Sequence, residues 1–270
     1  MVMAVVDESR QWVDSMPEAY ERGLAPTVFR PFAVDLARRA AARSPRRVLE
    51  LAAGTGTLTA ELLGVLPSAA ITATDLNLAM VEVGRRRAPG ATWREADAMS
   101  LPFADASYDL VACQFGVMFF PDKRAAFAEV RRVLPAAGAL LLNAWDTLDT
   151  HDFQAAVVAG LRRAFPQDPP TFLQSTPHGY TDVDVIVADM VAGGLQCETI
   201  QSVTLEGHAA SAADVAIGYC RGTPLRAEIE ARGVLATATA VVADELTQRL
   251  GSGAVTGRMT AHVIEAIPVR

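Results

Sequence analysis

The stretch RRVLELAAGTGTLTA, residues 46–60, decides the fold of this chain. Its apolar run ends in an acid, Glu50, and then breaks into a loop with glycines at 54 and 56. A short apolar run, a glycine-rich loop and a following helical pattern predict a buried strand whose tight turn presents backbone amides to a ligand. The glycines alone do not identify that ligand, because Glu50 adds a negative charge where a phosphate would normally lie.

Two kinds of phosphate-binding loop fit this stretch poorly. The dinucleotide fingerprint needs a third small residue after its first two glycines, and a threonine stands there in the run Thr55-Gly56-Thr57-Leu58-Thr59. A Walker A loop would continue with Gly-Lys-Ser/Thr, which is missing here. A carboxylate beside a pyrophosphate would also be repelled by like charge, whereas the same group favours a cationic ligand without phosphate.

Short apolar runs alternate with helical patterns between residues 46 and 145. This order predicts a doubly wound α/β fold with a mainly parallel sheet. Helices are expected to start near Thr55, Asn77 and Pro121, with Asn77 as an N-cap and Pro121 in a first turn. The expected strands are RRVLELA, AAITATD, ATWREAD, YDLVACQF and GALLLNAW.

The flanking segments divide the chain further. We expect a helix over 31–44 within an N-terminal helical segment, 1–45. Residues 46–146 would form the α/β core. Residues 147–270 would supply lid helices and the last two strands, near 197–205 and 261–269, within a single domain overall. The helices between 147 and 195 and between 210 and 250 are interpreted as insertions over the carboxyl edge of the sheet, where ligands bind in parallel sheets.

The amino-acid composition excludes several classes of binding partner. The chain has 270 residues, 51% of them hydrophobic and 20% charged, with a net charge of −7. An acidic balance argues against a nucleic-acid surface. Three scattered cysteines fit neither disulfide nor zinc spacing, and no apolar run is long enough to span a bilayer or resembles a signal peptide. We therefore expect a cytoplasmic, bacterial protein with no nucleic acid, no membrane insertion and no metal, with a homodimer left open.

Glu50 and the glycines together resemble the first motif of the class I S-adenosylmethionine-dependent methyltransferases, acid-x-Gly-x-Gly-x-Gly. Here it reads ELAAGTG, with Ala52 in place of the first glycine. Further segments follow in the family's order, and the resemblance covers residues 48–145. It implies a Rossmann-like methyltransferase fold of about seven strands and S-adenosylmethionine as cofactor, with quinone-biosynthesis and natural-product enzymes as the similar branch.

The resemblance also assigns roles. It implies that the N-terminal segment, 1–45, closes over the cofactor and that residues 46–146 form the cofactor-binding core. It implies that Asp75, ending TATD, accepts hydrogen bonds from the ribose hydroxyls while Leu76 packs on adenine. Asp97, in EADAMSLPF, would accept from the adenine amine, with the Ala98 amide on the ring. The full set of expected cofactor-binding residues is Glu50, Ala52, Gly54, Thr55, Gly56, Asp75, Leu76, Met80, Asp97, Ala98, Met99, Cys113 and Gln114.

The fourth strand ends in Cys-Gln-Phe-Gly and lacks the Asn/Asp-Pro-Pro-aromatic tetrad that amino-methyltransferases of nucleic acids and protein amides share. We therefore expect a small, partly apolar acceptor, methylated on oxygen or carbon rather than nitrogen by in-line displacement. His178, Gln114 and Tyr180 are the candidate catalytic residues. The acceptor-binding candidates are Phe29, Phe32, Phe115, His151, His178 and Tyr180.

Two rival interpretations remain open at the level of sequence. A nucleotide-dependent oxidoreductase would also place an acid at Asp75. A non-catalytic S-adenosylmethionine-binding partner module would keep Glu50, Asp75 and Asp97 without turnover.

Overall fold

The computed structural model describes residues 16–269. Within them, seven strands form one sheet in the order β3-β2-β1-β4-β5-β7-β6. β1 to β5 are parallel, whereas β7 runs antiparallel to both β5 and β6. The strands are β1 (Arg47–Leu51), β2 (Ala70–Asp75), β3 (Thr92–Glu95), β4 (Leu110–Gln114), β5 (Ala139–Trp145), β6 (Leu195–Ala209) and β7 (Val255–Pro268). The predicted doubly wound, mainly parallel sheet is confirmed.

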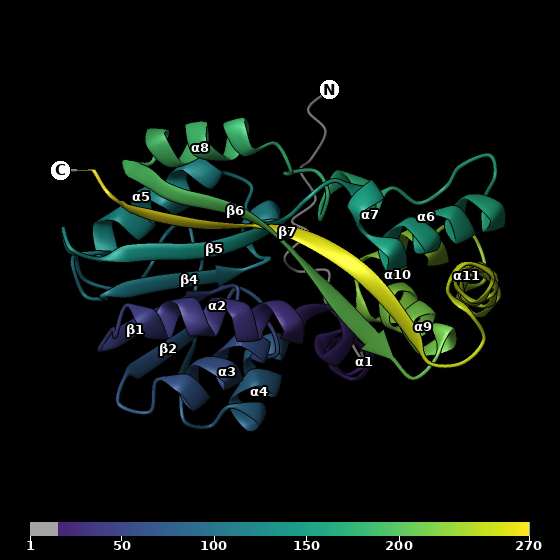
Figure 1. Cartoon of the computed structure of the whole chain (residues 1–270), viewed down its shortest axis with the longest axis horizontal. Helices are drawn as coiled ribbons and strands as arrows, with labels where there is room; N and C mark the ends of the chain where they lie inside the picture. The colour runs from purple at the N-terminus through teal and green to yellow at the C-terminus, as the bar shows by residue number, and fades with distance from the viewer. Residues whose placement is uncertain (1–15, 270) are drawn as a thin grey trace.

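Helices cover both faces of this sheet (Figure 1). α2 (Arg30–Ala42) and α3 (Thr57–Val65) pack on one face, and α4 (Leu78–Arg87) lies against β2 and β3. α5 (Lys123–Val133) and α8 (Val183–Ala192) cover the other face. Alternate strand residues serve the two cores: Val48 and Leu110 face α2 and α3, whereas Leu49 and Val111 face the α5 side. Burial on both faces explains why β1 and β4 read as continuous apolar runs.

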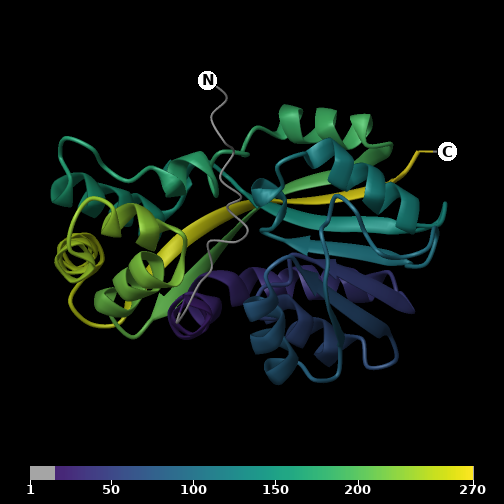
Figure 2. The same ribbon diagram turned by 180° about the vertical axis from the view of Figure 1, so that it is seen from behind.

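A helical lid stands at the carboxyl edge of the parallel strands. It consists of α6 (Asp152–Ala164), α7 (Phe172–Ser175), α9 (Ala212–Gly222), α10 (Leu225–Glu230) and α11 (Leu235–Leu250), with α1 (Met16–Gly23) packed on α9. β6 and β7 are long, and they run from the sheet into the lid (Figures 1 and 2). The lid is therefore tied to the sheet by a continuous two-stranded ribbon.

One local expectation is confirmed and two change. Asn77 does cap its helix, because its side chain accepts a hydrogen bond from the Met80 amide. The next helix, however, begins at Lys123 with Asp122 as its cap, so Pro121 precedes the helix rather than lying in its first turn. The prediction that all helices between 147 and 195 belong to the lid is wrong for α8, whose buried Ile186 and Met190 pack into the core beside α5.

Candidate functional site

The loop after β1 turns through three left-handed residues. Ala52, Gly54 and Gly56 have φ angles of 50°, 55° and 85°. Glycine adopts such angles without strain, whereas alanine pays a steric cost. This backbone carries the chain from the end of β1 to the first turn of α3 and leaves the Gly54 amide free to donate to Asp75 Oδ2 at 2.8 Å.

Asp75 organises two loops at once. Its Oδ2 accepts from Gly54 N, and its Oδ1 accepts from Asn77 N at 2.9 Å. Burial raises the pKa of Asp75, and these backbone hydrogen bonds oppose that shift. After β3, Asp97 Oδ1 accepts from the Met99 amide at 2.8 Å. Both carboxylates therefore have their local turns fixed before any ligand is bound.

Glu50 is the most deeply buried of these acids, at 1% exposure. Desolvation raises its pKa to about 8, although the Thr59 hydroxyl donates to its Oε2 at 2.7 Å. A buried carboxyl that is costly to ionise gains most from a cationic group placed beside it. The site thus suits a ligand with a positively charged end.

One cavity, of about 310 Å³, opens along the carboxyl edge of the sheet beneath the lid. Ten of the thirteen predicted cofactor-binding residues line it. Those ten are Glu50, Ala52, Gly54, Asp75, Leu76, Met80, Asp97, Ala98, Met99 and Gln114. Thr55, Gly56 and Cys113 are absent from the lining. The Gly56 backbone forms the N-cap of α3, and Cys113 is buried with its pKa raised to about 12 by desolvation.

Beyond the acids, the cavity continues into a chamber walled by aromatic rings. Phe115 stacks on Trp145 with ring centroids 3.5 Å apart, and Phe29 packs edge-on to Phe115 at 5.8 Å. Gln114 Nε2 donates to Phe29 O at 2.8 Å, which ties the tip of β4 to the segment before α2. The chamber lining is completed by Tyr20, Leu24, Phe119, Phe120, Pro121, Gln154, Phe172, Leu173, Pro177, Tyr219 and Thr223.

Of the predicted acceptor-binding residues, Phe29 and Phe115 line the cavity and four do not. Phe32 is fully buried and packs edge-on against Phe115 and Trp145. His151 is also fully buried and packs edge-on against both Trp145 and His178, and burial lowers its pKa to about 3. Both belong to the packing behind the chamber wall.

His178 and Tyr180, expected as catalytic residues, bond within the protein instead. The His178 ring places Nδ1 2.7 Å from Asp146 O and Nε2 2.8 Å from the Gln154 amide. Tyr180 donates its hydroxyl to Asp189 Oδ2 at 3.1 Å, on the side of α8. His178 is thus held against α6 and Tyr180 against α8, and neither side chain lines the cavity.

Sequence reasoning missed the polar groups of the lid. Gln154 on α6 and Tyr219 on α9 both line the chamber. The Tyr219 ring is 2% exposed, and its buried hydroxyl has no hydrogen-bond partner among the described residues. Since a buried unpaired hydroxyl is costly, a ligand group is the natural partner for it. Neither residue lies in a motif, and only the helical periodicity of α6 and α9 marked them, as core positions.

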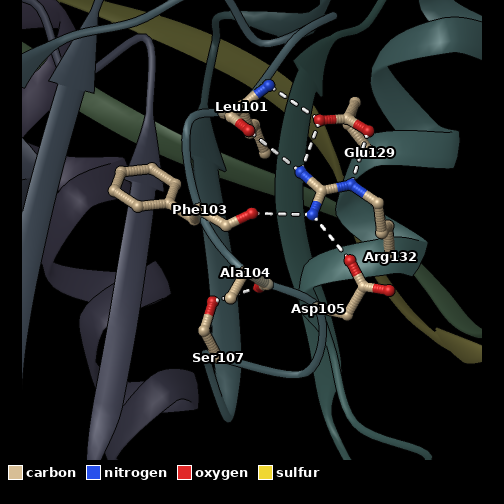
Figure 3. Close-up of polar contacts among 7 residues, drawn as sticks. All are labelled: Leu101, Phe103, Ala104, Asp105, Ser107, Glu129 and Arg132. Atoms are coloured by element: carbon tan, nitrogen blue, oxygen red, sulfur yellow. Dashed lines mark hydrogen bonds and ion pairs between the residues drawn. The ribbon is translucent and has the colours of Figure 1, made fainter.

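Arg132 on α5 holds the loop that follows Asp97 and Met99 (Figure 3). Its guanidinium donates to the carbonyls of Leu101 and Phe103 at 2.9 and 2.7 Å. It also pairs with Glu129 and Asp105, and Glu129 Oε2 accepts from the Leu101 amide at 2.7 Å. Hydrogen bonding to Arg132 lowers the pKa of Glu129. This loop lies next to the end of the cavity that Glu50, Asp75 and Asp97 line, here called the cofactor end, and Arg132 fixes it to the core.

Comparison with known proteins agrees with this geometry. Residues 48–138 match the family model described as a methyltransferase domain. Residues 48–138 therefore form a methyltransferase domain. It is 40% identical over 110 residues to a demethylmenaquinone methyltransferase of Deinococcus radiodurans, covering 39% of this chain and 46% of that protein. It is 29% identical over 178 residues to a ubiquinone/menaquinone biosynthesis C-methyltransferase of Ectopseudomonas mendocina, covering 60% of this chain and 70% of that protein.

The match to the Deinococcus relative spans about half of that protein's length. Among solved structures, the YcgJ protein of Bacillus subtilis superposes with a TM-score of 0.57 at 23% identity, over 89% of this chain and 99% of the other. The [4+2]-cyclase SpnF superposes with a TM-score of 0.53 at 16% identity, over 88% and 82% of the two chains. At these identities the structures establish the fold and not the reaction.

Two further findings bear on partners. No helix among residues 16–269 is both long and apolar enough to cross a bilayer. In the same part of the chain, histidine, cysteine and acidic side chains nowhere gather in a group of three that could hold a metal ion. The acids near residue 150 instead bond within the protein, Asp152 with Arg258 and Asp146 with His262.

Proposed function

We propose that this protein transfers the methyl group of S-adenosylmethionine to a small, largely apolar, ring-containing acceptor held in the aromatic chamber. One observation carries the proposal: the cavity that begins at Glu50, Asp75 and Asp97 continues without a break into that chamber. A cofactor seated on the acids would project its methyl group toward Phe115 and Trp145, and an apolar ring fits between such walls.

The cofactor end supplies charge and hydrogen bonding. Asp75 suits the ribose hydroxyls, Asp97 suits the adenine amine, and Glu50 suits the cationic amino-acid end. A dinucleotide would instead bring its pyrophosphate beside the buried Glu50, which like-charge repulsion opposes. This favours methyl transfer over nucleotide-dependent oxidoreduction.

The acceptor end supplies position rather than a base. The titratable side chains that line the cavity are Tyr20, Glu50, Asp75, Asp97 and Tyr219, so no histidine or lysine of the described residues faces the acceptor. Methyl transfer is an in-line displacement that needs alignment and the exclusion of water. An acceptor that reacts here would release its proton without a strong base, as an electron-rich ring carbon or an acidic hydroxyl does. Carbon or oxygen is therefore favoured over an amine nitrogen.

The test begins with calorimetric titration of S-adenosylhomocysteine and, separately, NADH into the purified protein and its Asp75→Ala variant. We expect micromolar binding of S-adenosylhomocysteine alone, weakened by roughly 1–3 kcal/mol in the variant. Transfer of labelled methyl from S-adenosylmethionine to a panel of hydroxylated naphthalenes and quinols would then establish turnover. Binding of NADH would overturn the proposal, and cofactor binding without transfer to any acceptor would favour a non-catalytic partner module.

A further inference from the structure

The pair formed by His178 and Gln154 sets the polarity of the chamber wall. His178 is 9% exposed and Gln154 is 3% exposed. Gln154 lines the cavity, whereas His178 stands behind it with Nε2 2.8 Å from Gln154 Oε1, the amide oxygen. No hydrogen bond from a described residue reaches the other terminal atom of that amide. One end of the Gln154 side chain is therefore engaged by the protein, and the other end is available to a ligand.

The hydrogen-bond partners of His178 determine which end that is. Nδ1 lies 2.7 Å from the Asp146 carbonyl, which can only accept, so Nδ1 must carry a proton. A neutral imidazole has only one N–H, so Nε2 is then a lone pair that needs a donor. In Gln154 only the amide nitrogen can donate. A half-turn of the amide about its last bond places that nitrogen on His178 and the oxygen toward the chamber.

The surroundings keep the ring neutral. His178 packs edge-on to His151, with ring centroids 4.6 Å apart, and burial lowers the pKa of His178 to about 4. The nearest acid, Asp146, opposes that shift, but its carboxylate pairs with His262 at 3.4 Å. At neutral pH an imidazolium is not available to donate from both nitrogens.

We propose that His178 holds Gln154 with its amide oxygen facing the chamber, so that Gln154 selects methyl acceptors that present a hydroxyl or N–H at that wall. His178 is in this view a positioning residue and Gln154 a specificity-determining one. The claim about ring and amide orientation stands independently of the reaction, whereas the claim about acceptors rests on the proposed function.

Nuclear magnetic resonance tests the orientation directly. The chain has four histidines, and the ring nitrogens of His178 can be assigned in ¹⁵N-histidine-labelled protein by comparison with a His178→Phe variant. At pH 7 we expect a protonated Nδ1 and an unprotonated Nε2. A protonated Nε2, in either the neutral or the charged ring, would overturn the proposal. This measurement needs neither cofactor nor turnover, so it can fail while methyl transfer succeeds, and the reverse also holds.

A matched pair of probes tests the selection. 2-Naphthol can donate a hydrogen bond, whereas 2-methoxynaphthalene cannot. Titrated into protein saturated with S-adenosylhomocysteine, the naphthol should bind about tenfold more tightly, which is the ratio that one hydrogen bond supplies. Equal affinities, or no binding of either probe, would contradict the role of Gln154.

Variants separate selection from loss of folding. Gln154→Leu should reduce the ratio of the affinities for 2-naphthol and 2-methoxynaphthalene from tenfold to about twofold or less, and it should leave S-adenosylhomocysteine binding unchanged. His178→Phe keeps an aromatic ring against His151 but frees the amide to rotate, so the ratio should fall by about threefold. Gln174→Leu, on α7 in the same lid but outside the cavity lining, is the control and should keep the full ratio. An unchanged ratio in Gln154→Leu would count against the proposal even if every variant folds.

Discussion

The two ends of the cavity are built in different ways. The cofactor end consists of three loops that follow β1, β2 and β3, and parallel strands bring such loops to one edge whatever their sequence separation. The lid end gathers Tyr20, Gln154, Phe172 and Tyr219 from four helices that the chain reaches at widely separated points. The cofactor end therefore depends on the topology of the parallel sheet, which many proteins share. The lid end depends on how the helices of this particular chain pack together.

The largest expected effect concerns the clamp that steadies the cofactor end. Arg132→Met removes a group of charge-assisted hydrogen bonds and leaves the buried side of Glu129 without its cation. We expect a loss of about 3 kcal/mol in the free energy of unfolding, measured by urea denaturation, and roughly tenfold weaker S-adenosylhomocysteine binding.

Arg131→Met is the matched control for that variant. Arg131 is the preceding residue, and within residues 16–269 its guanidinium makes a single hydrogen bond, a long one of 3.3 Å to Val269 O. It should cost less than about 0.5 kcal/mol. If the two variants were equally stable, the clamp would not be what orders residues 101–107.

The contrast between the two ends also explains what could be predicted from sequence. The alternation of strands and helices along the chain, the Asn77 cap and the places of Glu50, Asp75 and Asp97 at strand ends follow from local patterns in the sequence. His178 could not be placed in this way, because its loop turns inward only when α6 supplies Gln154 and the residue after β5 supplies the Asp146 carbonyl. Gln154 and Tyr219 were missed because a polar residue in an amphipathic helix looks the same in sequence whether it faces solvent or a ligand.

Glu50 offers a test of charge at the cofactor end. In the free protein its pKa of about 8 leaves it mostly protonated at pH 6 to 7. A ligand ammonium favours the carboxylate, so binding must release a proton below pH 8. Affinity for S-adenosylhomocysteine should therefore rise as pH rises toward 8, by up to about tenfold, or 1.4 kcal/mol, per pH unit, and then level off.

Calorimetry in two buffers with different heats of ionisation counts the released protons. We expect close to one proton per ligand at pH 6.5 in the unchanged protein, and almost none in Glu50→Gln. A pH-independent affinity would mean that the cationic end of the ligand lies away from Glu50.

Tyr219 tests the lid end. Because its buried hydroxyl has no hydrogen-bond partner among the residues that the structure describes, Tyr219→Phe should raise the free energy of unfolding by up to about 1 kcal/mol. The same change should weaken acceptor binding by about five- to tenfold and leave S-adenosylhomocysteine binding unaltered. Tyr180→Phe should behave in the opposite way, losing about 1 kcal/mol of stability with acceptor binding intact, since that hydroxyl bonds to Asp189 outside the cavity. Loss of stability in both variants would show that Tyr219 has an internal partner.

The smallest expected effect lies in the glycine loop, where alanine stands at the motif's first glycine position. Ala52 has a φ of 50°, a left-handed angle that costs an L-residue about 1 kcal/mol, so Ala52→Gly should stabilise the protein by roughly 0.5–1 kcal/mol without changing cofactor affinity. Ala53→Gly is the matched control. Ala53 is 8% exposed and lies outside the left-handed region, so its replacement should destabilise the protein by about the same amount through added chain entropy. Thermal unfolding of both variants compares the two changes in stability. If local backbone angles determine the conformation of the loop, Ala52→Gly should raise the stability and Ala53→Gly should lower it. Changes in the same direction would mean that packing against the lid determines the conformation of the cofactor end.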